Sequence, residues 1–184
     1  MECYRCENPD CGFTLEEEPD VCPHCGGTFF LRIDEEEMTA SDWVSLGGQA
    51  VDEKRDTDAL AYYQRASAMG DVQGLTNLGW CFEAGVGVEA DPKQAVVLYA
   101  QAAAREYVPA LTNLGYCYTY GIGVEKDLAK ALECFRKGAE QGFPRAQFLL
   151  AEAYRQGEGV EQSDVEAVKW YQSAAWLGYP GAQT

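Results

Sequence analysis

The residues with the clearest chemical potential are cysteines near the amino terminus. Five of the eight cysteines fall within residues 3–25, in the stretch CYRCENPDCGFTLEEEPDVCPHC. Two close thiolate pairs on facing turns are the usual ligands of a tetrahedral zinc site, and Cys22 and Cys25 in CPHCGG form one such pair. Residues 1–33 contain too few apolar side chains to fold by burial alone, so we expect a metal ion to stabilise this segment.

The other half of the site has two possible compositions. Cys3 and Cys6 have the common two-residue gap, whereas Cys6 and Cys11 enclose Asn-Pro-Asp, a typical turn sequence, and a glycine follows the second thiol as it does in CPHCGG. We favour Cys6 with Cys11 and keep Cys3 as an alternative ligand. His24 lies inside the second pair, and we expect it to be an exposed turn residue.

This segment resembles the rubredoxin-like zinc-ribbon family, because YRC precedes the first ligand, CGF follows the second and CPHCG carries the other two. The resemblance covers about thirty residues. It implies a structural Zn²⁺ held by Cys6, Cys11, Cys22 and Cys25 on a small three-stranded sheet. The four-residue gap between Cys6 and Cys11 departs from the family pattern. Iron is the alternative cation, since four thiolates bind either metal.

The charge of the chain limits its partners. The net charge is -16, and residues 1–38 hold eleven acidic residues against two basic ones, a net of -9. Phosphate binding needs clustered lysine and arginine, so nucleic acid and anionic membranes are disfavoured. The acidic runs EEEPD at 16–20 and DEEEM at 34–38 are either solvated segments, the interpretation we favour, or docking surfaces for a basic partner.

The cysteine pattern and the apolar runs indicate a cytoplasmic protein. There is no apolar stretch near 18 residues and no basic-then-apolar leader. The other cysteines, Cys81, Cys117 and Cys134, fall in the helical part of the chain. This distribution suits reduced thiols and a metal site better than a disulfide framework.

The rest of the chain repeats itself every 36 residues. LTNLGWCFEAGVGV at 75–88 recurs as LTNLGYCYTYGIGV at 111–124. Each unit predicts two helices: leucines at helical spacing in the first helix, a glycine at its end (Gly85, Gly121 and Gly157), and then an N-cap residue for the second (Asp91, Asp127 and Ser163). Such repeats bury their apolar faces by stacking on one another, so we predict an all-α solenoid.

The repeated pattern L-G-x-x-[FY]-x-x-G-x-G-V resembles the Sel1-like repeat family, which is related to tetratricopeptide repeats. The family implies a right-handed superhelix of helix pairs that acts as a scaffold or adaptor without chemistry of its own. We therefore expect a zinc ribbon at 1–33, an acidic linker at 34–39 and a repeat array at 40–184. The units of the array would span about 40–70, 71–107, 108–143 and 144–179.

In tetratricopeptide-like arrays the first helix of each pair lines the concave face. By register, the residues expected to bind a protein or peptide there are Thr76, Asn77, Trp80, Thr112, Asn113, Tyr116, Tyr120, Phe148 and Arg155. Aromatic side chains beside amides suit an extended peptide or a partner helix. The alternative is that Trp80 and Tyr116 pack between units and that the asparagines only follow the repeat pattern.

Nothing in the sequence predicts catalysis. The single histidine lies within the cysteine cluster, and no convergent acidic pair is evident, so we assign no catalytic residue. The sequence predicts a non-catalytic scaffold with a structural zinc ribbon. The alternative is a redox module, in which the ribbon holds iron and the repeats dock it to an oxidoreductase. YPGAQT repeats the start of GFPRAQFLL, so the chain is either a fragment or self-associates through an apolar C-terminal face.

Overall fold

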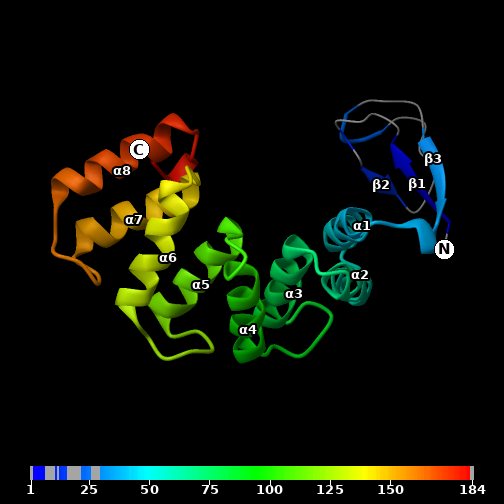
Figure 1. Cartoon of the computed structure of the whole chain (residues 1–184), viewed down its shortest axis with the longest axis horizontal. Helices are drawn as coiled ribbons and strands as arrows, with labels where there is room; N and C mark the ends of the chain where they lie inside the picture. The colour runs from blue at the N-terminus through cyan, green and yellow to red at the C-terminus, as the bar shows by residue number, and fades with distance from the viewer. Residues whose placement is uncertain (1, 7–10, 12, 16–21, 26–29, 183–184) are drawn as a thin grey trace. The chain divides into compact units, whose positions relative to one another are not determined.

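The computed structural model describes residues 2–6, 11, 13–15, 22–25 and 30–182 (Figure 1). The chain divides into two compact units, Met1–Ala90 and Asp91–Thr184. The first unit holds a small sheet and three helices, and the second holds five helices of the described residues. None of the helices in this part of the chain has the length and apolarity that crossing a membrane requires.

The sheet of the first unit has three antiparallel strands. They are β1 (Glu2–Cys6), β2 (Thr14–Leu15) and β3 (Phe30–Asp34), in the order β2-β1-β3. Tyr4 pairs with Leu15 on one side and with Arg32 on the other. The central strand, β1, ends at Cys6, so this cysteine lies where the strand leaves the sheet.

The acidic segment after β3 packs against the first helical hairpin. It forms a 3-10 turn, η1 (Glu35–Glu37), and the next residue, Met38, is only 4% exposed. Glu35 forms an ion pair with Arg65 on the second helix. The segment that the sequence suggests as a linker is thus part of the packed unit.

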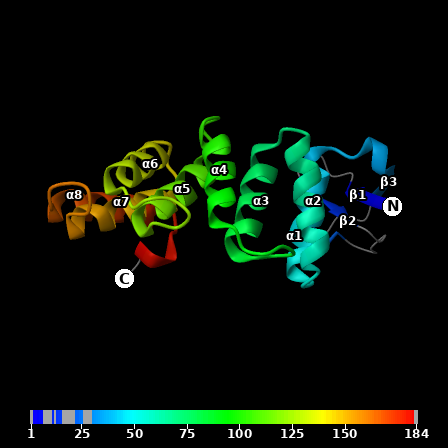
Figure 2. The ribbon, with the colours of Figure 1, turned by 90° about the horizontal axis from the view of Figure 1, so that it is seen from below.

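Within each unit, every helix packs against the next one in the sequence, and Figure 2 shows the ribbon from below. The first unit contains α1 (Ala40–Asp52), α2 (Asp56–Ala68) and α3 (Val72–Ala84). The second unit contains α4 (Pro92–Ala103), α5 (Val108–Tyr120), α6 (Leu128–Glu140), α7 (Pro144–Gln156), α8 (Asp164–Trp176) and a short 3-10 turn, η2 (Pro180–Ala182). Consecutive helical repeats are the arrangement of an α-solenoid, as the sequence predicts.

The helix ends lie where the sequence places them. Gly85, Gly121 and Gly157 close the first helix of their repeats in the left-handed conformation, with φ between 70° and 74°. The side chains of Asp91, Asp127 and Ser163 accept hydrogen bonds from the first turn of the following helix. These caps satisfy backbone groups that have no partner within the helix, and so they define where each helix starts and ends.

Close helix packing depends on glycine at two repeat positions. A Cβ at Gly115 would lie 2.5 Å from Cε1 of Phe135, so a side chain there would prevent α5 from approaching α6. A Cβ at Gly123, whose φ is +67°, would overlap the carbonyl oxygen of Pro92 at the start of α4. The loop after one helix is therefore seated on the preceding repeat, and only glycine fits there.

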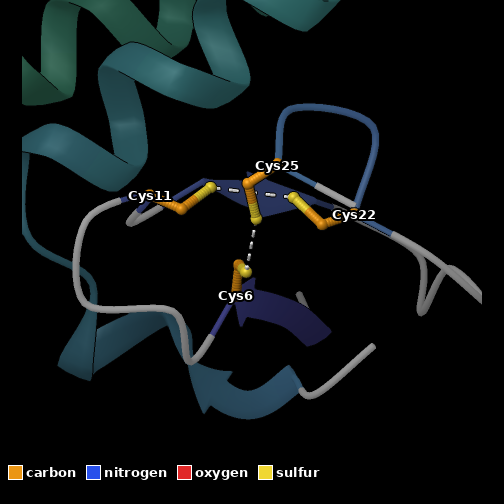
Figure 3. Close-up of side chains that lie close together, drawn as sticks. All are labelled: Cys6, Cys11, Cys22 and Cys25. Atoms are coloured by element: carbon orange, nitrogen blue, oxygen red, sulfur yellow. Dashed lines mark hydrogen bonds between the residues drawn. The ribbon is translucent and has the colours of Figure 1, made fainter. Parts of the chain in front are cut away.

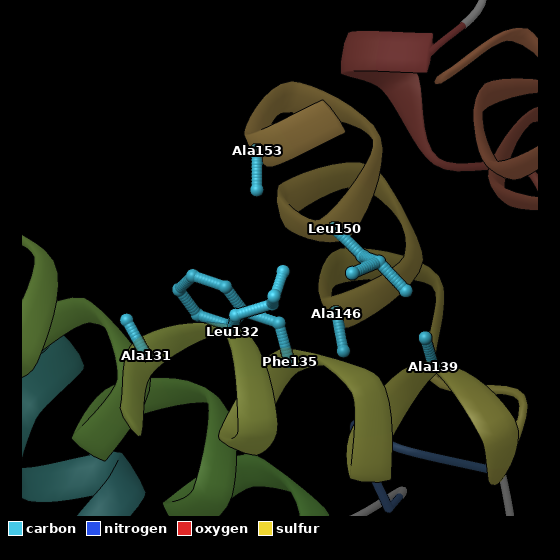
Figure 4. Close-up of a cluster of buried hydrophobic side chains, with 7 residues drawn as sticks. All are labelled: Ala131, Leu132, Phe135, Ala139, Ala146, Leu150 and Ala153. Carbon is cyan, nitrogen blue, oxygen red and sulfur yellow. The ribbon is translucent and has the colours of Figure 1, made fainter. Parts of the chain in front are cut away.

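The α6–α7 interface holds a hydrophobic cluster of the second unit (Figure 4). Leu132 and Phe135 on α6 and Leu150 on α7 belong to this cluster, with alanines of both helices around them. The complete cluster is Ala131, Leu132, Phe135, Ala139, Ala146, Leu150 and Ala153. Small residues between large ones let the two helices interdigitate, as close-packed interiors require.

Candidate metal centre and partner groove

Four cysteines of the first unit converge on one point (Figure 3). The sulfurs of Cys6, Cys11, Cys22 and Cys25 all lie within 4.8 Å of one another. The Sγ atoms of Cys6 and Cys25 are 3.6 Å apart, and those of Cys11 and Cys22 are 3.7 Å apart. A tetrahedral site with metal–sulfur bonds of about 2.3 Å has sulfur–sulfur edges of roughly 3.8 Å. The four thiols thus have the spacing of a tetrahedral metal site and could hold a metal ion.

The environment of the cluster disfavours the ionised form of the Cys11 thiol. Cys6 and Cys22 are buried, at 3% and 1% exposure, while Cys25 is exposed. Desolvation, together with the neighbouring thiols, raises the pKa of Cys11 to about 12. A metal ion that binds four thiolates must displace their protons, so its affinity would increase with pH.

The structure also bears on the two other residues considered for this site. His24 is exposed and its ring stacks on Phe13, with centroids 5.5 Å apart, so its side chain has the turn position that we expect and lies outside the cysteine cluster. Cys3 lies in β1, where its backbone pairs with Ile33. The side chain of Cys3 lies outside the described residues, and the choice between Cys3 and Cys11 stays a prediction in favour of Cys11.

A buried carboxylate joins the sheet to the repeats. Asp42, only 1% exposed on α1, accepts hydrogen bonds from both Nε (2.8 Å) and Nη2 of Arg5 and from the hydroxyl of Thr14. It also accepts from the backbone and hydroxyl of Thr39 (2.6 Å each), which completes a capping box at the start of α1. Burial alone would raise the pKa of Asp42, but the hydrogen bonds from Arg5, Thr14 and Thr39 outweigh it and hold the pKa below its ordinary value.

This hydrogen-bond network around Asp42 was not predicted from the sequence. Thr39 followed three residues later by an acidic residue is a capping-box signal that was available in the sequence. The ion pair with Arg5 was not available, because it joins residues 37 positions apart across two kinds of structure.

A groove of about 430 Å³ opens between α5, α6 and α7 in the second unit. We call it the α5–α7 groove. Tyr116, Thr119 and Tyr120 line it from α5, and Phe148, Leu149 and Glu152 from α7. The remaining lining residues are Leu128, Ala131, Leu132, Phe135, Ala153, Gln156 and Glu158. The groove therefore combines an apolar floor with carboxylates and an amide at its edge, as ligand-binding pockets commonly do.

The walls of the α5–α7 groove consist of aromatic side chains that pack against other aromatic rings. The rings of Tyr116 and Tyr120 are 4.5 Å apart, and Tyr120 is 62% exposed. Phe148 packs against Tyr171 (5.6 Å) and Tyr179 (5.1 Å). Three residues predicted from the repeat register are thus brought to one concave site.

One carboxylate in the groove stays charged. Arg155 binds Glu152 through Nη2 at 2.7 Å, Gln156 donates to the same oxygen at 2.7 Å, and Tyr171 donates to the other. Arg155, with smaller contributions from Tyr171 and Gln156, holds the pKa of Glu152 below its usual range. Arg155 therefore acts on the groove through Glu152 and does not line it.

Two predicted contact residues are corrected by the structure. Thr76 is 5% exposed and Thr112 is fully buried, and each hydroxyl donates to the carbonyl four residues earlier in its own helix, that of Val72 (2.7 Å) or Val108 (2.9 Å). Their side chains are buried against neighbouring helices, because their positions lie one residue away from the exposed face of the helix. Neither threonine presents its side chain at the surface of this structure.

The other predicted residues keep some exposure. Trp80 on α3 is 37% exposed and Asn77 is half-buried, and both belong to the first unit. In the second unit, Asn113 accepts a hydrogen bond from Nη1 of Arg145 at 3.3 Å, which occupies its amide oxygen. Trp80 and Asn77 remain predictions as partner contacts.

Helix α8 carries an exposed apolar face. Val165, Val168 and Trp176 are 79%, 52% and 89% exposed. These values are consistent with the sequence-based prediction that this end self-associates, which stays a prediction.

Comparison with known proteins agrees with the helical repeats. The Sel1 repeat model matches residues 45–71, 72–107, 108–143 and 144–179. Among curated proteins, no sequence matches the chain.

Several solved structures are similar. A Sel1 repeat protein from Oxalobacter formigenes shares 33% identity over 76% of this chain and 57% of its own, with a TM-score of 0.70. The protein c5321, a protective antigen of uropathogenic Escherichia coli strains that displays an SLR fold, shares 33% identity over 80% of this chain and 33% of its own, with a TM-score of 0.73. Cysteine-rich protein B of Helicobacter pylori is 24% identical over 71% of this chain and 94% of its own, with a TM-score of 0.56, which shows the fold alone.

The chain spans 57% and 33% of the lengths of the first two of these structures. The matched repeats nevertheless account for most of the chain and coincide with its helical hairpins. The chain therefore belongs to the Sel1-repeat family, whose members are generally non-catalytic scaffolds for protein–protein interaction.

Proposed function

We propose that this chain is a non-catalytic adaptor that binds a protein or peptide in the α5–α7 groove and holds a structural Zn²⁺ in an N-terminal ribbon. The observation that carries the proposal is the convergence of Tyr116, Tyr120 and Phe148 on one pocket of about 430 Å³. Aromatic anchors in a concave site dominate the energetics of most protein interfaces.

The shape and chemistry of the groove favour a partner with one bulky apolar side chain. Its floor consists of α6 residues such as Leu132 and Phe135, and its open wall is Tyr120. Gln156 at the edge, whose amide nitrogen donates to Glu152, would accept a hydrogen bond through its amide oxygen from a peptide backbone or a polar side chain beside that anchor. The net charge of -16 argues against a nucleic acid or an anionic membrane as the partner.

Zinc is the proposed cation because the site has the features of a structural one. Four thiolate ligands leave no coordination position for a substrate, and two of the cysteines are nearly inaccessible to solvent. A bound ion would hold together a segment that offers little apolar surface to bury. Cys6, Cys11, Cys22 and Cys25 would be its ligands.

The groove can be tested by site-specific photo-crosslinking. A photoreactive amino acid at Tyr120 should capture a partner in cells, and the same amino acid at Val97, 47% exposed on α4 and outside the groove, serves as the control position. The captured partner is then purified, and its affinity is measured for the Tyr120→Ala and Val97→Ala variants. We expect Tyr120→Ala to weaken binding by at least about tenfold, as for an aromatic anchor. Equal affinities of the two variants would contradict the proposal.

The metal proposal has its own readout. Elemental analysis of the purified full chain should find about one zinc per chain, and Cys22→Ser should lose it. Cys3→Ser is the matched control and should keep the ion if Cys11 completes the site. Loss of metal in Cys3→Ser, with retention in Cys11→Ser, would show that the alternative ligand set is correct. Iron in place of zinc, visible as colour, would favour the redox alternative.

A further inference from the structure

A second groove lies in the first unit and shares no residue with the α5–α7 groove. It has a volume of about 620 Å³ and opens between η1, the start of α1 and the end of α2. We call it the η1–α2 groove. Its lining residues are Glu35, Glu36, Met38, Trp43, Arg65, Ala68 and Met69.

The base of the η1–α2 groove is apolar. Met38 and Trp43 are each only 4% exposed and therefore belong to the packed interior beneath it. Met69, at the rim, is 54% exposed. An exposed methionine beside an apolar floor adapts its shape to an incoming side chain, so the groove can accept at least one apolar anchor.

The rim of the groove is acidic. Glu35 and Glu36 line one side, and the carboxyl end of α2 contributes the negative pole of its helix dipole at Met69. The first unit as a whole is also negatively charged. Residues 1–90 hold nineteen acidic and five basic residues, a net of -14, whereas residues 91–184 hold eleven and nine, a net of -2.

Arg65 shows how this groove accommodates a cation. Its guanidinium lies 4.5 Å from the centre of the Trp43 ring and forms an ion pair with Glu35. The side chains of Arg65 and Glu35 are 48% and 38% exposed, so a partner's lysine or arginine can approach the same carboxylate from the solvent side, while the Trp43 ring stays covered.

We propose that the η1–α2 groove docks a basic segment of a partner protein, in which lysine or arginine flanks an apolar side chain. Charge complementarity selects this occupant. A second copy of the chain would bring another net charge of -16 to an acidic rim, and nucleic acid would bring phosphates. The proposal is independent of the α5–α7 groove, because the two sites lie in different units.

The test starts from a displayed library of random 12-residue peptides, selected on the metal-loaded full chain. The strongest peptide is synthesised with a fluorescein label, and its affinity is measured by anisotropy. We expect enriched peptides to carry lysine or arginine on both sides of leucine, methionine or phenylalanine. Glu36→Lys should weaken binding by about tenfold or more, and Met69→Ser by about threefold or more, since both side chains are exposed and the variants should fold.

Glu89→Lys is the matched control, with the same change of net charge in the same unit. Glu89 follows Gly87, which lies against Asp56 at the first residue of α2, and the groove is at the opposite end of that helix. The affinity of the Glu89→Lys variant for the peptide should stay within about twofold of the wild-type affinity. If Glu36→Lys and Glu89→Lys weaken peptide binding equally, the attraction comes from the overall negative charge and not from this groove. That result would overturn the proposal.

Two further results would also overturn it. One is that no basic peptide is enriched, or that enriched peptides lack basic residues. The other is that the peptide is insensitive to Glu36→Lys but lost in Tyr120→Ala, which would assign it to the α5–α7 groove. Dimerisation that Glu36→Lys abolishes would instead identify a second copy as the occupant and would equally refute the proposal.

Discussion

Replacing Asp42 by alanine should selectively destabilise the junction between the sheet and the repeats. The substitution removes the acceptor of the two Arg5 hydrogen bonds, of the Thr14 hydroxyl and of the Thr39 cap. Because these groups belong to β1, β2 and the start of α1, all three elements lose a shared anchor.

The free energy of unfolding lost in Asp42→Ala can be estimated from how exposed each former hydrogen-bond partner is. Thr39 is exposed and Arg5 is 29% exposed, so water can replace part of what they lose, and we assign about 1 kcal/mol to the cap and about 1 kcal/mol to the ion pair. Thr14 is fully buried, so its hydroxyl is left without an acceptor at a further cost of about 1 kcal/mol or more. The sum is about 3 kcal/mol.

Hydrogen exchange measured by mass spectrometry can localise this loss. A decrease of about 3 kcal/mol in the opening free energy corresponds to roughly 100-fold faster exchange of the α1 amides. Asp52→Ala is the control, because Asp52 is an exposed residue at the last position of the same helix. If Asp42→Ala accelerates exchange of α1 no more than Asp52→Ala does, then the buried carboxylate does not anchor the sheet and the reasoning fails.

Three substitutions in the second unit should change its urea unfolding midpoint. Glu106→Gly should stabilise by about 0.5–1 kcal/mol, because Glu106 has φ +60° where other repeats have glycine. Gln147→Leu should stabilise by up to about 1 kcal/mol, because the buried Oε1 has no hydrogen-bond partner among the described residues, and the Ala139 carbonyl to which Nε2 donates (3.2 Å) keeps its hydrogen bond from the Gly142 backbone. Gly123→Ala should destabilise by about 3 kcal/mol, because its Cβ would overlap the Pro92 carbonyl at a positive φ. A midpoint that is unchanged or shifts in the opposite direction would contradict the corresponding explanation.

The glycine prediction has an internal control. Gly142 has φ +78° but open space around its Cβ position, so Gly142→Ala reports backbone strain without steric overlap and should cost about 1 kcal/mol. Equal losses in the two alanine variants would mean that the contact with Pro92 is not limiting.

Local signals made much of the fold predictable. The glycines that close α3, α5 and α7 and the caps at Asp91, Asp127 and Ser163 are determined by backbone conformation and by short-range hydrogen bonds, which the residue types themselves express. The 36-residue period added the register, because identical units must stack in the same way. Register also brought Tyr116, Tyr120 and Phe148 to one face.

The same register failed for the two threonines. Thr76 and Thr112 follow the polar pattern of an exposed stripe, but threonine can satisfy its hydroxyl on the carbonyl four residues earlier and then tolerate burial. A sequence shows the polarity of such a side chain and not the partner that satisfies it.

The sequence by itself determined the elements of this protein: the helical hairpins and their boundaries, the Sel1 repeat pattern and the cysteines capable of forming a metal site. Only the tertiary structure decided how distant residues combine, including the burial of Asp42 among Arg5, Thr14 and Thr39. The enclosure of the α5–α7 groove and the placing of an apolar floor under the acidic rim at Glu36 were decided in the same way. The physical reason is range. Caps and turns depend on a few consecutive residues, whereas ion pairs and grooves depend on the packing of elements that are separated in the chain.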